Sequence, residues 1–375
     1  MTAEQCAKIA GYKERLAHSL QSSRLFLSDS RDEKRRIISS LVCPFVPPLY
    51  QYRKCNEGSI ASLSTGTFLL QDPRKFNDVF DCLIHFDSEK YEQEMCSFTP
   101  KDARRIIERL RCGEIPENEE VHYGGKEVVM FYRMLSTFSD AVLEKGYYSC
   151  FSKFQHVSRE FVGRCLYTMQ GLSRISCFSE DPVSPIMWGH YGDAGKGFCV
   201  RYDFQPLLGL SKCRRSGREC CVERCEGMDH GICGEFSSWS LFPVLYTTSR
   251  YDLTYLVEDE VRNLIRRGCG CPDITPQDYD LLRYYKIALF KSIDWSYEKE
   301  WRIIMTADGL LAHECLSSPS LFQTEVLLGP LISKGNENAI RKAVANYEMK
   351  DGRGVRVRKV SADYFGKGYA FHVME

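Results

Sequence analysis

Residues 294–305 read DWSYEKEWRIIM, in which two glutamates, Glu298 and Glu300, stand just before an apolar Ile-Ile-Met. If 297–305 is a β-strand, its side chains alternate between two faces, so Glu298, Glu300 and Arg302 share one face. The two glutamates would then lie roughly 6.5–7 Å apart along the strand. Because unpaired buried charge is costly, this face needs partners, water or a ligand. We therefore expect the start of the strand at the rim of a cleft, although a solvated edge strand with a Glu–Arg pair fits the same pattern.

The composition of the chain indicates a globular protein. Its 375 residues are 43% hydrophobic, enough for one large domain or two ordinary ones. Fifty lysines and arginines balance fifty aspartates and glutamates, which argues against a surface given over wholly to nucleic acid. The N-terminus is charged, without the apolar centre of a signal peptide, and no run approaches the roughly 18 apolar residues of a membrane span. We expect a cytoplasmic protein without membrane contact, in which most of the 18 cysteines are reduced and pack in the core.

Hydrophobic periodicity predicts the elements of the fold. We expect strands at 49–53, 67–71, 174–178, 197–203, 241–246, 297–305, 324–329 and 355–360. Helices are expected at 2–21, 31–42, from Asn56 onward, over much of 86–170, and at 253–267, 276–293 and 336–347. Long helical blocks between strands, without regular βα alternation, predict an α+β fold. Its sheet should be split and mixed or antiparallel, with long helical insertions and an N-terminal helical extension.

Three regions follow from this pattern. Residues 1–48 form the helical extension, which ends at a proline-rich stretch. Residues 49–330 form the α+β core, with an insertion rich in Cys and Gly at 205–240, and 331–375 form a helix–strand tail packed on the core.

Three motifs in the core carry a family resemblance. They are FNDVFD at 76–81, CFSEDPVSPIMWGHYGDAGKGFCVRYD at 177–203 and DWSYEKEWR at 294–302. With LYQYR at 49–53, in this order, they resemble a bacterial family known as domain of unknown function 2971, over roughly residues 49–330. That family has Phe-Asn-Asp-Pro-Phe-Asp, Met-Trp-x-His-Tyr and Tyr-Glu-x-Glu-Trp-Arg motifs, and this chain departs from it at Val79, where proline is usual. We expect FNDVFD to be structural, with both phenylalanines buried and Asn77 or Asp78 satisfying turn amides.

A more distant resemblance suggests a chemistry. ADP-ribosyltransferases of the arginine-serine-glutamate type have a Tyr-Arg ending their first strand, then a serine-containing strand, then a Glu/Gln-x-Glu that begins a later strand. LYQYR, ISCFSE and YEKEWR occur here in that order. The resemblance implies that Arg53 contacts NAD phosphates, that Ser179 (or Ser176) supports the nicotinamide-ribose pocket, that Glu300 is catalytic and that Glu298 positions the acceptor. The family serine motif is Ser-Thr-Ser-like, from which Cys177-Phe178-Ser179 departs.

The chemistry implied by this resemblance is coherent. Breaking a nicotinamide–ribose bond develops an oxocarbenium-like centre that a carboxylate stabilises. Other candidate binding residues are the aromatic and charged side chains beside the motifs, namely Tyr50, His190, Tyr191, Trp301 and Arg302. NAD is the expected co-substrate and no metal is expected. Glu300 lies deeper along the expected strand than Glu298, so Glu300→Gln should fold normally and abolish NAD cleavage.

The role in the cell follows only from this resemblance. It implies a toxin or defence effector that modifies a nucleic acid or protein acceptor, with an antitoxin or defence partner. Two other classes stay open: a non-enzymatic domain that senses NAD or another nucleotide, and a metal-independent hydrolase that uses Glu298 and Glu300 as an acid/base pair.

Three further patterns favour plain structural roles. GDAGKG at 192–197 does not fit a phosphate-binding loop, and a tight turn with exposed Lys196 is expected. Within the 205–240 insertion, only Cys221 and Cys225 have the spacing of a zinc-ligand pair. The basic runs at 212–218 and 262–268 are expected to be solvated surface, with contact to phosphate backbones as the alternative.

Overall fold

The computed structural model describes most of the chain: residues 2–26, 29–41, 43, 45–91, 100–114, 132–145, 159–204, 241–260, 280–306, 315–317, 323–351, 354–363, 367–368 and 370–374. The expected insertion at 205–240, with its cysteines and the 212–218 basic run, lies outside these residues, as does the 262–268 run.

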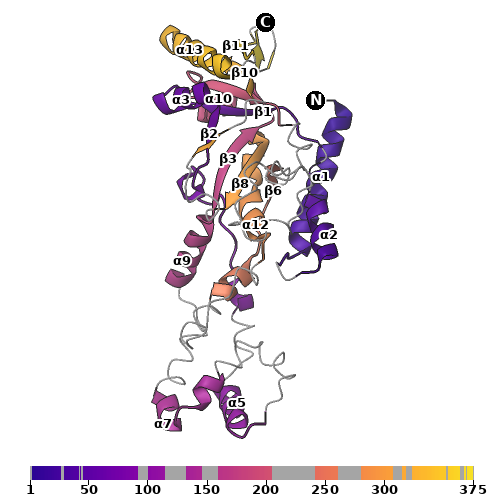
Figure 1. Ribbon diagram of the computed structural model, residues 1–375, viewed down its shortest axis with the longest axis vertical. Helices are drawn as coiled ribbons and strands as arrows, with labels where there is room; N and C mark the ends of the chain where they lie inside the picture. The colour runs from indigo at the N-terminus through magenta and orange to yellow at the C-terminus, as the bar shows by residue number, and fades with distance from the viewer. Residues whose placement is uncertain are drawn as a thin grey trace.

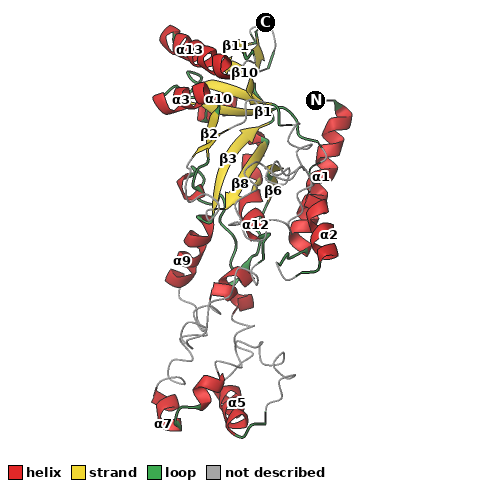
Figure 2. Cartoon of the chain, viewed as in Figure 1, coloured by secondary structure: helices red, strands yellow, loops and turns green. Residues whose placement is uncertain are grey.

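A mixed, mostly antiparallel sheet forms the centre of the described chain, with strands in the order β12-β11-β10-β4-β1-β3-β8-β5 (Figure 2). Its strands are β1 (Leu49–Arg53), β3 (Ser173–Ser179), β4 (Phe198–Tyr202), β5 (Leu241–Pro243), β8 (Glu300–Thr306), β10 (Gln323–Leu328), β11 (Arg356–Ala362) and β12 (Phe371–Val373). Neighbouring strands are antiparallel except β10 and β11, which run parallel. Two small sheets pair β2 (Thr67–Leu69) with β9 (Cys315–Ser317), and β6 (Leu245–Thr247) with β7 (Phe290–Ser292). The α+β class and the mixed sheet predicted from the sequence are confirmed.

The register of the sheet assigns each side chain to one of two faces. Tyr50 pairs with Ser179, which pairs with Glu300, and on the other side Tyr50 pairs with Arg201, which pairs with Glu325. Because directly paired residues point the same way, these five side chains stand in one row on a single face. We call this the glutamate face. The opposite face carries the intervening residues of each strand.

Helices cover both faces of the sheet. The short α10 (Pro185–His190) lies on the glutamate face, where Trp188 packs with Cys199, Leu327 and Val360. On the opposite face, α3 (Glu57–Thr65) packs against α13 (Lys334–Asp351), whose Ile340 and Val344 join the main core. Both lie together at one end of the molecule in Figure 1. Asn56 caps α3 by accepting from Ser59 N at 2.8 Å, as the sequence predicted.

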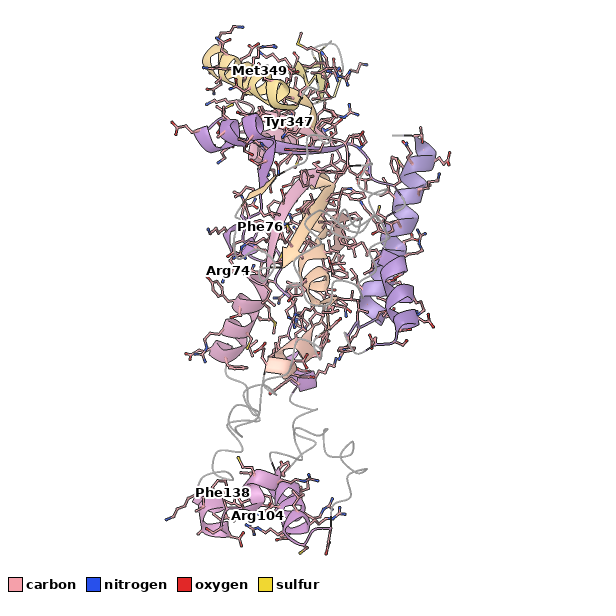
Figure 3. All side chains as sticks on the ribbon, in the orientation of Figure 1. Arg74, Phe76, Arg104, Phe138, Tyr347 and Met349 are labelled. Atoms are coloured by element: carbon pink, nitrogen blue, oxygen red, sulfur yellow. The ribbon has the colours of Figure 1, made fainter. Side chains whose placement is uncertain are left out.

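The other helices lie beside the sheet or, in the case of α5 (Pro100–Arg111) and α7 (Asp140–Leu143), away from it (Figure 1). At the N-terminus, α1 (Ala3–Ser22) begins with a Thr2 capping box and packs against α2 (Arg31–Leu41) and α12 (Arg283–Leu289). The helix α9 (Arg159–Gln170) precedes β3 and contacts the turn η1 (Pro73–Lys75). Figure 3 shows Arg74 and Phe76 of that turn region beside β3. The pair α5 and α7 is joined by an Arg111–Asp140 ion pair and lies farthest from α13 (Figure 1).

Several predicted elements need correction. Residues 293–298 form the 3₁₀-helix η7 (Ile293–Glu298), so the strand predicted at 297–305 begins only at Glu300. Within the described part of the helix predicted at 276–293, which starts at residue 280, the helix α12 is followed directly by β7 instead of continuing to 293. β12 and β9 had no sequence signal, because strands of three residues contain too few positions to show a period. Among the described helices, none combines the length and apolarity needed to cross a bilayer.

Candidate active site

The two glutamates approach each other through a turn rather than along a strand. Glu298 ends η7, Lys299 takes a left-handed conformation with φ of 47°, and Glu300 opens β8. Their carboxylates nevertheless converge on one ammonium group. Lys291 Nζ lies 2.5 Å from Glu298 Oε2 and 3.0 Å from Glu300 Oε2. The side chains therefore meet as expected, although strand alternation is not the cause.

A buried ion network surrounds this contact. Arg302 donates through Nε to Glu300 Oε1 at 2.8 Å and through Nη2 to Glu300 Oε2 at 3.0 Å. The same Nη2 donates to Asp81 Oδ2 at 2.6 Å, and Lys291 Nζ lies 3.3 Å from that oxygen. All five residues, Asp81, Lys291, Glu298, Glu300 and Arg302, are at most 6% exposed. Ionised side chains at this depth persist only because each has partners.

The network contains three carboxylates and only two cations. Burial alone would raise the pKa of Glu300, but Arg302 and Lys291 hold it well below its usual range. Burial would likewise lower the pKa of Lys291, but the neighbouring carboxylates, Glu300 first, raise it instead. Burial and the charge of Glu300 raise the pKa of Glu298 to about 7. Glu298 is thus the member of the network that gains and loses a proton near neutral pH.

Glu298 also connects the buried network to residues at the protein surface. Tyr191, at the C-terminal end of α10, donates its hydroxyl to Glu298 Oε1 at 2.6 Å and accepts from the exposed Asn77 at 3.1 Å. Beside it, His190 Nδ1 lies 3.2 Å from the Tyr297 hydroxyl. The Tyr297 ring lies 6.0 Å from the ring of Trp295, and that ring stands over the Lys291 ammonium at 5.0 Å. His190, Tyr191, Trp295 and Tyr297 are exposed or half-buried, and we call them the aromatic rim.

Arg53, expected at the same site, lies elsewhere. The β1–β3 register puts Arg53 and Ser176 on the face opposite Glu300. There the Arg53 guanidinium donates to Gln51 Oε1 at 2.6 and 2.9 Å, to the Tyr202 hydroxyl at 2.6 Å and to Ser62 Oγ at 3.2 Å. The expected convergence of Arg53 with Glu300 is therefore wrong. Odd and even positions of one strand lie on opposite faces of the sheet. Only the pairing of β1 with its neighbours decides which of these positions share a face with Glu300.

The other expected site residues also lie on different faces of the sheet, and some of them are buried. Ser179 is on the glutamate face, but it is 1% exposed and donates to the carbonyl of Glu298 at 2.6 Å, where it fixes the backbone. Trp301 is fully buried on the opposite face and donates to Glu180 at 2.7 Å, so it cannot stack on a ligand. Tyr50 is half-buried in the row of the glutamates, two strands from Glu300. Of the predicted set, His190, Tyr191 and Arg302 join the two glutamates.

Two residues of the network were not singled out in the sequence. Asp81 ends the FNDVFD motif, in which only Asn77 and Asp78 were considered for turn roles. Asp78 does accept from Phe80 N at 2.9 Å, but Phe80 is 57% exposed, so its expected burial is wrong. Lys291 stands in ALFKSI, where a lone lysine inside an apolar run was a usable signal of a buried ion pair.

Two surface hollows of the described chain lie away from these residues, one of about 350 Å³ beside Phe161 and Met169, the other of about 360 Å³ between α3 and α13. No group of three or more His, Cys, Asp or Glu suited to a metal occurs among the described residues. The 192–197 stretch is the expected tight turn with Lys196 exposed, and Asp193, Ala194 and Gly195 all have positive φ.

Comparison with known proteins identifies one family over part of the chain. Residues 187–303, from α10 into β8, match the family described as Protein of unknown function (DUF2971). The match contains Tyr191, Glu298 and Arg302, while β1 and Asp81 lie outside it, so it is shorter than the expected 49–330. No curated protein and no solved structure matches the chain. The resemblance to ADP-ribosyltransferases thus gains no support from these comparisons.

Proposed function

We propose that this chain is an enzyme that cleaves the N-glycosidic bond of a nucleotide, with NAD as the candidate donor and Glu298 as the working carboxylate. One observation carries the proposal. Three buried carboxylates share two cations, so one carboxylate, Glu298, titrates near pH 7 beside the partly exposed aromatic rim. A general base is most effective when its pKa lies near the working pH.

In this proposal Glu298 is the catalytic glutamate, whereas the sequence had predicted that role for Glu300. Both oxygens of Glu300 accept from a cation, Arg302 or Lys291, whereas Glu298 Oε1 accepts from the neutral Tyr191 hydroxyl. Glu300 therefore supports the site by holding Lys291 and Arg302 in place. Glu298 has the neighbours that can admit a ligand, because Tyr191, His190 and Tyr297 are only partly covered.

The residues of the site suit the planar ring and the ribose of a nucleotide, but Arg53 does not supply the expected phosphate contact. The aromatic rim suits stacking on a planar base or nicotinamide ring. Ionised Glu298 would stabilise positive charge on the ribose carbon as the C–N bond breaks and its electron pair leaves with nicotinamide. Water or an acceptor then bonds to that carbon, and its proton passes to Glu298. Arg53 does not fit the phosphate role, because its guanidinium is committed on the opposite face.

The test uses purified full-length chain with labelled NAD, alone and with a cell lysate. We expect release of nicotinamide by the wild type and a loss of at least about a hundredfold in Glu298→Gln, the loss typical of a main electrostatic contributor. Glu337→Gln, at the Glu337–Arg341 pair on α13, is the matched control and should keep full activity.

Other results would change or reject the assignment of an enzyme. Binding of NAD without cleavage would replace the enzyme with the nucleotide-sensing alternative. Neither binding nor cleavage by the wild type, or equal cleavage by Glu298→Gln, would reject the proposal.

A further inference from the structure

A second charged cluster occupies the glutamate face at its other end. Glu325 of β10 is 1% exposed and stands beside Arg201 of β4 and Arg356 of β11, each its direct partner in the sheet. Arg358, two residues along β11 from Arg356, reaches the same carboxylate. Directly paired and alternate residues point to one side, so the three arginines and Glu325 share one patch of the sheet.

The three guanidinium groups are unequally engaged by Glu325. Arg358 Nε donates to Glu325 Oε1 at 2.6 Å, which is a true hydrogen bond. Arg201 Nη1 lies 3.8 Å from Glu325 Oε2, and Arg356 Nε lies 3.9 Å from Oε1, both beyond hydrogen-bond length. Arg201 Nε is buried and has no hydrogen-bond partner in the described chain. A buried donor left without an acceptor is uncommon in native proteins and calls for an explanation.

The charge of the cluster also exceeds what Glu325 requires. Three arginines and one glutamate leave a surplus of two positive charges. The side chains remain accessible, with Arg201 27%, Arg358 33% and Arg356 66% exposed. Only Arg358 is within hydrogen-bond distance of the buried carboxylate, so the guanidinium groups of Arg201 and Arg356 are available to an anion.

We propose that Arg201, Arg356 and Arg358 form a binding site for the terminal phosphate of a small phosphomonoester. Such a group carries about 1.5–2 negative charges near neutral pH, which matches the surplus. Planar guanidinium forks suit phosphate oxygens and give short, charge-assisted hydrogen bonds. The half-buried Tyr50, which pairs with Arg201 in the sheet, places a hydroxyl on the same face.

The local nature of the cluster favours a small molecule over a nucleic acid. The two surplus positive charges lie on three neighbouring strands. The whole chain has no net charge, so no excess of basic residues extends this patch into the long basic surface that a nucleic acid needs. Arg201 and Glu300 are three strands apart, or about 14 Å at roughly 4.8 Å per strand. The proposal rests on the arginine cluster alone and does not depend on the function proposed above.

Calorimetric titration of the full-length chain with AMP and with inorganic phosphate tests the proposal, at constant ionic strength set with chloride. We expect the wild type to bind both anions, and Arg201→Gln and Arg356→Gln to weaken binding at least about tenfold. Arg356 is largely exposed, so its variant should fold even if Arg201→Gln does not. Arg341→Gln, at a half-exposed arginine of α13 paired with Glu337, should bind like the wild type.

The remaining outcomes would overturn the proposal. They are absence of AMP and phosphate binding by the wild type, or unchanged binding by Arg356→Gln. Binding of a single-stranded oligonucleotide that depends on Arg201, without binding of AMP or phosphate, would instead assign the cluster to a nucleic-acid backbone. Glu298→Gln should bind phosphate normally, which separates this result from that of the glycosidic reaction.

Discussion

At the scale of single residues, Glu298 and Glu300 differ through their partners rather than their chemistry. Glu300 accepts two hydrogen bonds from Arg302 and one from Lys291, whereas Glu298 shares Lys291 and otherwise meets a tyrosine hydroxyl. Two residues of one type, two positions apart, therefore have pKa values shifted in opposite directions.

Glu300→Gln should destabilise the fold, contrary to the sequence-based expectation that it folds normally. Its removal leaves Arg302 and Lys291 buried with too little negative charge, which typically costs about 3–5 kcal/mol. Urea denaturation at pH 7 measures the loss. A change below about 1 kcal/mol would show that Asp81 and Glu298 alone satisfy both cations.

The raised pKa of Glu298 predicts a pH-dependent stability. The folded chain holds this proton with a pKa of about 7, against an ordinary value of 4.5, so it binds the proton more tightly than the unfolded chain does. The contribution is complete below about pH 4.5 and is lost as the pH rises through 7. A shift of this size corresponds to at most about 3 kcal/mol.

Glu298→Gln cannot ionise at this position, so it should lack this dependence. Between pH 5 and pH 8, the free energy of unfolding of the wild type should fall relative to that of the variant. Parallel pH profiles of the two proteins, measured by urea denaturation, would contradict the assigned pKa.

At the scale of elements, the turn at 192–197 is attached to the end of β10 by close backbone contacts. Gly329 N donates to the carbonyl of Gly197 at 2.9 Å, and Leu331 N donates to the carbonyl of Gly195 at 2.9 Å. A Cβ on Gly329 would stand 2.8 Å from Gly197 O and closer still to Gly195 O, so neither backbone could yield cheaply. These contacts position the chain that leads from Tyr191 into β4.

Gly329→Ala should therefore cost about 3 kcal/mol, the usual penalty of overpacking. Gly335→Ala, near the start of α13 where a Cβ meets nothing within 4 Å, is the control and should be neutral or slightly stabilising. Thermal denaturation of both variants gives the comparison. Equal melting temperatures would mean that the turn moves away without loss.

At the scale of the whole molecule, one buried ion pair attaches the N-terminal helices to the core. Asp280 Oδ1 accepts from Leu25 N at 3.0 Å, and Asp280 Oδ2 accepts from Lys286 Nζ at 2.7 Å. Lys286 Nζ also donates to the carbonyl of Ser23 at 2.8 Å. The segment after α1 is thereby held against α12, which precedes the strand that carries Lys291.

Asp280→Asn should loosen this attachment, because it leaves the Lys286 charge buried without its counterion, a change that typically costs about 3–5 kcal/mol. Limited proteolysis should then cut near residues 23–26 faster than in the wild type. Lys8→Ala, which removes the exposed Lys8–Glu4 pair of α1, should cost less than about 1 kcal/mol and leave the cleavage rate unchanged. Equal cleavage in Asp280→Asn would show that apolar packing alone holds the helices.

The sequence by itself determined the features that depend on local pattern. The stretch LYQYR located β1, Asn56 marked the start of α3, and the glycines of 192–197 predicted a tight turn, since each signal comes from a few consecutive residues. Glu298, Glu300 and Arg302 could be recognised as candidate site residues for the same reason, because they lie within one short stretch of sequence.

Tertiary structure alone decided which residues meet. Asp81 joins the network from a loop more than two hundred residues away, and Arg53 leaves the site because β1 pairs in the register that turns it to the opposite face. Strand pairing fixes the side on which every second residue stands, and a shift of one position would exchange the two faces. That choice is made by contacts between distant segments, as is the burial that shifts the pKa values of Glu298 and Glu300 in opposite directions.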